Sequence, residues 1–412
     1  MGAIRDASEQ LLSGQVKPED APPMTPRFEL ETIAEGVHFV SAFANVVAFE
    51  TSEGLVLVDI GSFLFAGRTK DVLRESVGAP LHTAIYTHGH VDHCFGVELY
   101  EAESGASPAN ILAHRAVSRR FERYRLTRDY NTKINQRQFR IAAEFPGVFR
   151  EPTQTFDDAL SVSVGGRTLE LQHALGETDD HAWVWDPASK TLCTGDLFIW
   201  ASPNCGNPQK VQRYPREWAA ALRDMASREP EVLCPGHGVP IWGREHVRDA
   251  LVNTADYLDA IVRDVLVLLN EGARLDIILG EVSPPAALAA LPYLRPVYDE
   301  PEFIVRNVVR LYGGWWDGNP ANLKPARERA LAHEVVTLAG GVDRVVARAD
   351  ELASQEEFAL ACHLIEMAAA VSEEAKVFEV RRRIYSARAE RELSLMARGV
   401  FSGASEETTL RK

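Results

Sequence analysis

The stretch His88-Gly89-His90-Val91-Asp92-His93 places three imidazoles and one carboxylate within six residues. Neutral imidazole and ionised carboxylate are preferred ligands of zinc-like divalent cations. The preceding residues 81–87 (LHTAIYT) are rich in β-branched and aromatic side chains, which predicts a strand that ends where the cluster begins. A sheet end can aim loop ligands rigidly, so a metal site explains this stretch better than a run of surface histidines does. The spacing favours two neighbouring ions, with the first two histidines on one and Asp92 and His93 on the other.

The length and charge of the chain limit the classes of protein to consider. A chain of 412 residues is too long for one compact core, and two or three domains are expected. Its hydrophobic fraction of 46% and charged fraction of 25% are ordinary for a soluble globular protein. The net charge of -15 disfavours nucleic acid as a partner, because binding to phosphates needs a basic surface.

The cysteines and the N-terminal residues bear on the compartment. Five cysteines are scattered without a CxxC pair, which is typical of reduced thiols in a cytoplasmic protein. Residues 1–14 are polar and lack the apolar segment of a secretory signal, and no apolar run is long enough to cross a bilayer. We therefore expect a cytoplasmic protein without a membrane partner.

The hydrophobic pattern divides the chain into four regions. Residues 1–27 contain Pro22, Pro23 and Pro26 and are expected to form an irregular arm. Residues 28–245 alternate short strand-like runs with helical segments, which predicts an α/β domain built as two sheets with outer helices. Residues 246–400 are rich in alanine and leucine with helical periodicity, which predicts an all-α domain. Residues 401–412 are expected to be a flexible tail.

Within the α/β region, residues 113–145 form a long, basic and charged segment. We expect a solvated surface excursion there, although the segment could also form a lid or a dimer arm. The helices within 326–400 are expected to be plain dimer-packing helices rather than repeat-type helical hairpins.

Three later strand ends offer further ligands. Glu177, Asp196 and His237 each stand beside a glycine after a strand-like run, where the backbone can turn sharply. Glu177 or Asp196 could instead cap a turn, whereas a histidine in the sequence PGHG is hard to explain without a ligand role. His173 and His181 flank Glu177 and compete with it for the third position.

The combination of HxHxDH, a GD after a strand and a PGHG resembles the metallo-β-lactamase fold of metallohydrolases over roughly residues 28–244. The resemblance implies an αββα sandwich, followed here by the all-α domain. Asp59, in the run LVLVDIG, matches the buried acid that this family carries beneath its metal loop.

Two further features resemble one branch of that family. Most members carry PGHT as the third element, whereas residues 175–178 read LGET, with glutamate in place of histidine. Residues 314–323 (GWWDGNPANL) resemble the alkyl sulfatase dimerisation domain, whose branch also uses glutamate at the third element. The resemblance therefore implies a homodimer that forms through the helical domain 246–400.

The resemblance also implies a complete ligand set for two zinc ions in each chain. His88, His90 and Glu177 would hold one ion, and Asp92, His93 and His237 would hold the other. Asp196 would bridge them, and Asp92 would also orient a hydroxide that attacks the substrate. Cys94, next to His93, is expected to be a packing residue rather than a ligand.

The branch pattern is incomplete where it concerns the substrate. Alkyl sulfatases bridge their metals with glutamate, and this chain has Asp196. They hold the sulfate with an asparagine, which Asn204 matches, and an arginine for which the nearest cations here are Lys210 and Arg213. No counterpart of their C-terminal lipid-transfer-like domain follows in this sequence. Trp200 is a further candidate for substrate binding, and Trp315 and Trp316 could also supply an apolar wall.

We therefore expect a dinuclear zinc hydrolase that acts on an alkyl sulfate-like small molecule with an apolar part. The same scaffold could instead hydrolyse a lactone, a carboxylic ester or a thioester. Two competing hypotheses are a mononuclear iron dioxygenase of this fold and a helical scaffold protein with an inactive catalytic domain. The residue that would protonate the leaving group is left open among Tyr130, His181 and Lys210.

Overall fold

The computed structural model describes residues 2–103, 105 and 107–410. The chain forms two compact units, each described separately below. The sheet-containing unit comprises Met1–Asp129, Phe145–Ala273 and Ile277–Gly314. The helical unit comprises Tyr130–Glu144, Arg274–Asp276 and Trp315–Lys412.

The first sheet of the sheet-containing unit has seven strands in sequential order. Strands β1 to β4 pair antiparallel, and β4 to β7 pair parallel. Every residue of β2 and β4 is buried, because both faces of these central strands are covered. The strands are β1 (Glu29–Ala34), β2 (Val37–Ser41), β3 (Val46–Thr51), β4 (Gly54–Val58), β5 (Leu81–Ile85), β6 (Asn110–His114) and β7 (Gln154–Phe156).

The second sheet has six strands in the order β13-β12-β11-β10-β9-β8. β11 and β12 are a parallel pair, and both are buried throughout. His237 ends β12, whereas Asp196, expected after a strand, stands within β11, which continues to Ile199. The strands are β8 (Ala159–Val164), β9 (Arg167–His173), β10 (Ala182–Asp186), β11 (Thr191–Ile199), β12 (Val232–His237) and β13 (Ile241–Trp242).

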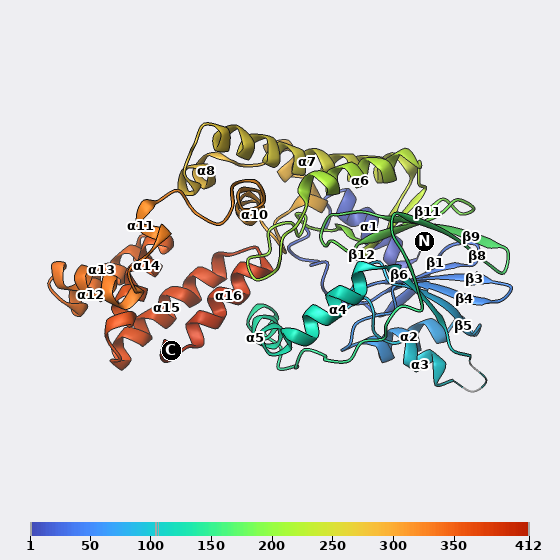
Figure 1. Cartoon of the computed structure of the whole chain (residues 1–412), viewed down its shortest axis with the longest axis horizontal. Coiled ribbons are helices and arrows are strands. Elements are labelled where there is room, and N and C mark those ends of the chain that lie inside the picture. Colours follow the sequence, from blue (N-terminus) through green and yellow to red (C-terminus); the bar gives the residue numbers. More distant parts are fainter. Residues whose placement is uncertain (1, 104, 106, 411–412) are drawn as a thin grey trace. The chain divides into compact units, whose positions relative to one another are not determined.

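Helices cover the outer faces of both sheets, so that the unit is a four-layered sandwich (Figure 1). The first sheet is covered by α2 (Ala66–Arg74), α3 (Val97–Glu101) and α4 (Ala116–Leu126). The second sheet is covered by α6 (Pro215–Ser227) and α7 (Arg244–Asn270). The predicted fold class, an αββα sandwich followed by an all-α region, is confirmed.

The compact units do not divide at residue 245, where the sequence pattern places a boundary. α7 packs along α6 and also contacts α10 (Pro301–Gly313), so the first part of the helical sequence belongs to the sheet-containing unit. Buried apolar residues line one side of α7 over much of its length, which gives these contacts a hydrophobic basis. The short helices between α7 and α10 are α8 (Leu275–Glu281), whose first two residues belong to the helical unit, α9 (Ala286–Ala289) and η1 (Pro292–Leu294).

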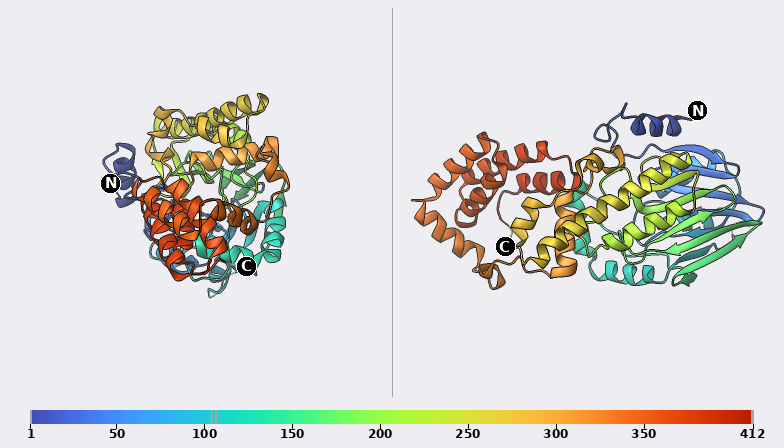
Figure 2. Two further views of the ribbon diagram at one scale, coloured as in Figure 1. Left: turned by 90° about the vertical axis from the view of Figure 1, so that its left-hand side faces the viewer. Right: turned by 90° about the horizontal axis from the view of Figure 1, so that it is seen from above.

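The helical unit has a core of its own, made by successive helices that lie side by side (Figure 2). The segment that resembles a dimerisation motif forms a turn in which Asp317 accepts hydrogen bonds from the Asn319 amide and the Asn322 side chain. The helices are α5 (Arg128–Phe139), whose first two residues belong to the other unit, α11 (Pro320–Leu323), α12 (Glu328–Leu338), α13 (Val342–Ser354), α14 (Phe358–Val371), α15 (Ala375–Arg391) and α16 (Leu395–Glu406).

Both ends of the chain are more regular than the sequence suggests. The expectation of an irregular arm is wrong for residues 3–12, which form α1 (Ala3–Leu12) and bury Ile4 and Leu11. The prolines that predict an irregular arm all follow this helix. The expected flexible tail is helical up to residue 406, where α16 ends, and its residues 411 and 412 lie outside the described residues. Among the described helices, none is long and apolar enough to cross a membrane.

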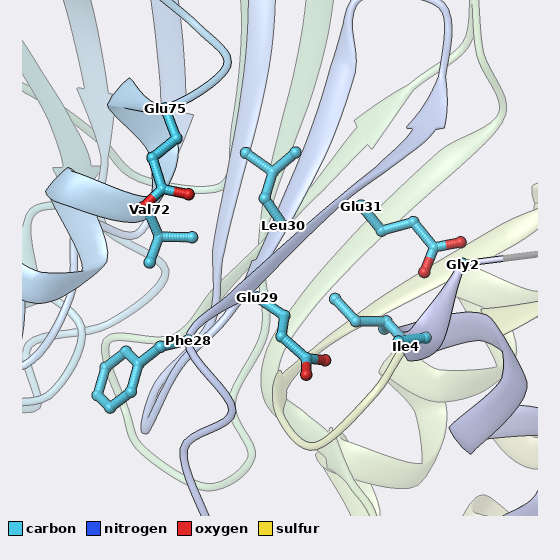
Figure 3. A pocket seen from close by; sticks show the side chains of 9 residues that line it. Gly2, Ile4, Phe28, Glu29, Leu30, Glu31, Val72 and Glu75 are labelled. Carbon is cyan, nitrogen blue, oxygen red and sulfur yellow. The ribbon is translucent and has the colours of Figure 1, made fainter.

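A hollow of about 360 Å³ lies where α1 meets β1 and α2 (Figure 3). Ile4, Leu30 and Val72 supply apolar wall. The Glu31 carboxylate at its rim accepts a hydrogen bond from the Arg5 amide, in the first turn of α1. The hollow contains none of the predicted ligands, and this carboxylate stabilises the start of the helix.

Candidate metal centre

The loop 88–93 follows β5 and folds back on itself, so that its side chains converge. The His93 amide donates to the His90 carbonyl over 3.1 Å, which closes the turn. The Nε2 atom of His88 lies 2.8 Å from Nδ1 of His90, which means that the two rings present nitrogens to the same point. Both His88 and His93 are fully buried.

A first cluster brings together His88, His90, Glu177 and Asp196, whose ligand atoms all lie within 4.8 Å of one another. Oε2 of Glu177 is 3.4 Å from Nδ1 of His90 and 3.9 Å from Nε2 of His88. These atoms are too far apart for strong hydrogen bonds and are spaced as ligands around a common centre would be.

A second cluster brings together Asp92, His93 and His237. Oδ2 of Asp92 lies 3.4 Å from Nε2 of His237 and 3.7 Å from Nε2 of His93. The structure thus places around one point the three residues that the family resemblance assigns to a second ion.

Asp196 lies between the two clusters. Its Oδ1 is 3.3 Å from Nε2 of His93, and its Oδ2 is 3.5 Å from Nε2 of His237 and 3.8 Å from Nε2 of His88. A carboxylate that faces ligands of both clusters has the geometry of a bridging ligand.

Unpartnered buried atoms test whether this centre fits metal ions. Among the described residues, Nε2 of His93, Oε2 of Glu177 and Oδ1 of Asp196 are buried and have no hydrogen-bond partner. Polar atoms buried in this way are costly unless something satisfies them. All three belong to the two clusters, and the nitrogen and oxygen donor set suits zinc-like cations. The residues present therefore fit divalent metal ions.

The pKa values of the histidines divide according to the carboxylates around them. Burial and the neighbouring imidazoles hold the pKa of His88 well below its usual range. Burial also opposes protonation of His237, but the carboxylates of Asp196 and Asp92 outweigh it and raise its pKa to about 10. Burial acts in the same sense on His93, and the surrounding carboxylates again outweigh it and raise the pKa of this histidine. In the protein alone, protons occupy positions from which a metal ion would displace them.

Other groups fix the orientation of the second-cluster histidines. Asp59 accepts from Nδ1 of His93 over 2.7 Å and from the amide and hydroxyl of Thr87 over 2.8 and 2.9 Å. Nδ1 of His237 donates to the carbonyl of Phe43. Each contact leaves Nε2 of the ring facing the cluster, as outer partners of metal-binding histidines do. Asp59 lies beneath the metal loop, where the family resemblance places it.

The two histidines that compete with Glu177 have other contacts. Nε2 of His181 accepts a hydrogen bond from the Asp196 amide over 3.1 Å, and its ring stacks on His88. His173 stacks on His114 with ring centres 3.8 Å apart and pairs with the Asp179 carbonyl. Neither belongs to a cluster of possible ligands among the described residues, whereas Glu177 does.

Arg213 lies beside the centre, which the sequence spacing did not reveal. Its Nη1 is 3.0 Å from Oε1 of Glu177, and Nδ2 of Asn204 donates to the same oxygen over 2.5 Å. Among the described atoms, Nε of Arg213 and Oδ1 of Asn204 are buried without a hydrogen-bond partner. Asn307 in α10 holds this arginine, because its side-chain amide bonds both the Arg213 amide and the Arg213 carbonyl.

Lys210 adds a third polar group near the centre. Its ammonium interacts electrostatically with Arg213, Asp92 and Glu177, and burial together with the neighbouring cation lowers its pKa to about 8. Lys210, Arg213 and Asn204 thus form a group that we call the basic group. It gives one side of a largely acidic centre a positive charge.

Several other candidates lie elsewhere. Trp200 is 1% exposed and donates to the Val239 carbonyl, so it is a core residue rather than a pocket wall. Trp315 is 74% exposed and Trp316 is 43% exposed, both in the helical unit. Tyr130 also belongs to that unit and is 57% exposed. Cys94 is buried in the core and donates to the His90 carbonyl, consistent with packing.

A buried ion pair beneath the loop was missed from the sequence. Nε of Arg120 donates to Oδ1 of Asp180 over 2.8 Å, and the Gly89 amide donates to Oδ2 of Asp180 over 2.9 Å. The only signal in the sequence is the pair Asp179-Asp180 between Glu177 and His181. Nothing in the basic segment 113–145 distinguishes Arg120 from its neighbours.

Comparison with known proteins assigns both regions of the chain. Residues 42–237 match the metallo-β-lactamase superfamily, and residues 275–410 match the alkyl sulfatase dimerisation family. The chain therefore carries a metallo-β-lactamase domain followed by an alkyl sulfatase dimerisation domain, as the sequence motifs indicate.

Curated relatives are alkyl sulfatases at modest identity. A linear primary-alkylsulfatase from a Pseudomonas species is 26% identical over 330 residues, which cover 73% of this chain and 62% of the relative. An (R)-specific secondary-alkylsulfatase from Pseudomonas is 28% identical over 341 residues, covering 74% of this chain and 50% of the relative. The chain thus spans between half and two thirds of the length of these relatives.

A solved structure shares the fold. The stereoselective inverting sec-alkylsulfatase Pisa1 from Pseudomonas sp. matches with a TM-score of 0.83 and 23% sequence identity. The match covers 92% of this chain and 65% of that protein. It extends the likeness in fold over nearly the whole chain.

Proposed function

We propose that this chain, which joins a metallo-β-lactamase domain to an alkyl sulfatase dimerisation domain, is a metal-dependent hydrolase of alkyl sulfate esters with two zinc ions. The observation that carries the proposal is the pair of ligand clusters that share Asp196 beside a buried arginine. The clusters supply the metal chemistry, and the arginine supplies a reason for an anionic substrate. The alkyl sulfatase relatives support the same substrate class.

The ligand assignment follows the two clusters. His88, His90 and Glu177 would hold one ion, and the residues Asp92, His93 and His237 would hold the other, with Asp196 between them. When bound, two such ions would act as Lewis acids and bring the pKa of a water near neutrality. The complete second cluster supports a dinuclear centre over a mononuclear iron site.

Asp92 has a second role in this proposal. Its side chain is 21% accessible, which makes it the most exposed of the three carboxylates in the clusters. A carboxylate at the solvent side of the cluster can accept a hydrogen bond from the attacking water and fix its direction. We therefore assign Asp92 both to the second ion and to orientation of the nucleophile.

The basic group would bind the sulfate of the substrate. A sulfate monoester keeps a negative charge at all ordinary pH values, and a guanidinium can hold two of its oxygens at once. Arg213 has a buried Nε–H donor free to meet such a group, Lys210 adds charge, and Asn204 would contribute its Nδ2 donor, which now bonds Glu177. A lactone, a carboxylic ester or a thioester has no charge at the reacting centre in its ground state, so these cations would not favour its binding as they favour that of a sulfate ester.

We also propose that the chain forms a homodimer through its helical region. The match to the dimerisation family over residues 275–410 supports this arrangement. Exposed apolar side chains of the helical unit, such as Leu338 and Leu360, supply surface for it. A cytoplasmic location is proposed from the five cysteines, which are all unpaired.

The test is a parallel assay of zinc-loaded protein on octyl sulfate, γ-octalactone, an octanoate ester and an octanoyl thioester. We expect turnover of the sulfate alone, and the Arg213→Met variant should raise KM for it at least about tenfold. Arg223→Met, which breaks exposed ion pairs between α6 and Asp256 and Asp259 on α7, is the matched control and should leave KM unchanged. Turnover of the uncharged esters without the sulfate would overturn the proposal.

A further inference from the structure

The side chains of Arg120 and Asp180 form an ion pair that is almost completely shielded from water. Arg120 stands on α4 and Asp180 in the loop between β9 and β10, sixty residues later in the chain. The two side chains are 4% and 0% exposed. Arg120 also reaches the carboxylate of Asp179, so that its guanidinium holds two consecutive residues of this loop.

This pair contacts both loops that carry ligands of the first cluster. Oδ2 of Asp180 accepts from the amide of Gly89, which stands between His88 and His90. On its own loop, Asp180 is three residues from Glu177. One carboxylate therefore joins the backbone of the loop 88–93 to the loop that holds Glu177.

The space around Gly89 shows how closely the parts fit. A Cβ atom at this position would lie 3.0 Å from Oδ2 of Asp180 and 3.1 Å from Cδ of Arg120. Glycine therefore lets the loop backbone approach the ion pair, and the first-cluster histidines are held on either side of that contact. The second cluster is oriented differently, by Asp59 and the Phe43 carbonyl.

We propose that Arg120 and Asp180 are positioning residues that set the metal affinity of the first cluster. Asp180 fixes the distance between the His88–His90 turn and Glu177, and Arg120 compensates the buried charge of Asp180 and anchors it to α4. The inference rests on the metal centre of the proposed function but not on its substrate. Residues of this kind, which hold the ligands without touching the ion, typically change metal affinity by ~10- to 100-fold when replaced.

Replacing one partner alone leaves an uncompensated buried charge, which can unfold the protein. The test therefore centres on the double variant Arg120→Met/Asp180→Asn, which removes both charges and keeps similar volumes. Asp180→Asn alone and the conservative Arg120→Lys accompany it. Arg125→Met is the matched control. Arg125 lies on α4, as Arg120 does, and its ion pair with Glu151 is exposed.

Apo protein of each variant is titrated with zinc, and both dissociation constants are compared with those of the unaltered chain. We expect the double variant to weaken one zinc step by ~10- to 100-fold and to leave the other unchanged. Arg120→Lys should lose less zinc affinity than the double variant, since lysine keeps the positive charge but not the paired donors of the guanidinium. Arg125→Met should match the unaltered chain in both steps.

Anomalous diffraction at the zinc edge, at limiting zinc, then identifies the step that changed. Reduced occupancy at His88, His90 and Glu177 with full occupancy at the second cluster supports the inference. Unchanged affinities in a folded double variant, or equal losses at both clusters, would overturn it. Unaltered protein that binds two zinc ions but hydrolyses no alkyl sulfate refutes the proposed substrate and leaves this test intact.

Discussion

The two ligand clusters of the centre are built in different ways. The second cluster, Asp92, His93 and His237, is oriented by acceptors: the Asp59 carboxylate and the Phe43 carbonyl each bind the far nitrogen of one imidazole. In the first cluster the distinctive ligand is an acid, Glu177, which is held by donors from Asn204 and Arg213.

The difference shows how one ligand can serve two purposes. A histidine at position 177 would need a hydrogen-bond acceptor for its second ring nitrogen and would not attract a nearby guanidinium. The glutamate instead pairs with Arg213, which brings a cation next to the metal centre. The glutamate at position 177, in place of a histidine, and the basic group therefore belong together, because Glu177 pairs with Arg213. This pairing distinguishes the first cluster from the second.

The largest expected effect is that of removing the ligand that both clusters share. Asp196→Asn should weaken both ions, because the bridging carboxylate carries the negative charge that faces both clusters. Turnover of alkyl sulfate should fall by about 1,000-fold or more, since activation of water depends on both ions. Zinc content by mass spectrometry and steady-state rates measure the two losses. Full zinc content with normal rates would show that Asp196 does not bridge.

Glu177→Gln should damage the first cluster alone. The amide keeps the shape of the side chain but loses the charge that attracts a metal ion and pairs with Arg213. One zinc ion should remain bound, with a rate reduced by ~100-fold or more. Zinc titration is the measurement, and loss of both ions together would mean that the clusters are not independent.

Asp59→Asn should produce the reverse pattern. His93 loses the carboxylate on Nδ1 that orients its ring, so affinity at the second cluster should fall by ~10- to 100-fold. The first cluster should keep its affinity. Competition with a chromophoric chelator resolves the two constants, and a loss confined to the first cluster would contradict the comparison.

Removal of zinc should lower stability as well as activity. The clusters bury Glu177 and Asp196 with oxygens that lack partners, and bound ions relieve this cost. At 100 times the dissociation constant, each ion should stabilise the folded chain by ~2.7 kcal/mol. Thermal unfolding with and without a chelator measures the difference. An unchanged Tm would indicate that no ion binds these residues.

A histidine outside both clusters should give the smallest effect. Burial and the stacked ring of His173 lower the pKa of His114 from 6.5 to about 4. The unfolded chain therefore binds more protons than the folded chain between these values, and stability should decline as the pH falls from 6.5 towards 4. His114→Gln should flatten this slope in urea unfolding of apo protein. A slope equal to that of the unaltered chain would assign it to other groups.

The side chains that the sequence singled out as candidate ligands lie together: the loop 88–93 follows β5, Asp196 stands within β11 and His237 ends β12. The motifs HGHVDH, GD and PGHG are local, and the packing of the two sheets against each other brings their side chains together. The choice of Glu177 over His173 and His181 came from the family resemblance, and the structure agrees with it, since of these three described residues it places only Glu177 in a cluster.

The sequence failed where position depends on packing between distant segments. Arg213 could be named only as one of the nearest cations, because its contact with Glu177 depends on Asn307, 94 residues later, which holds its backbone. The extent of the sheet-containing unit was missed because α7 shows helical periodicity without showing what it packs against. Trp200 was a candidate for the pocket wall because burial in a core and burial against a ligand leave the same mark in a sequence.

The most direct test of a dinuclear sulfatase centre is zinc titration of the apo protein while turnover of octyl sulfate is followed. We expect two zinc ions per chain and a rate that reaches its maximum only after the second ion has bound. A single bound iron with consumption of oxygen, or full sulfatase activity with one zinc ion, would contradict it.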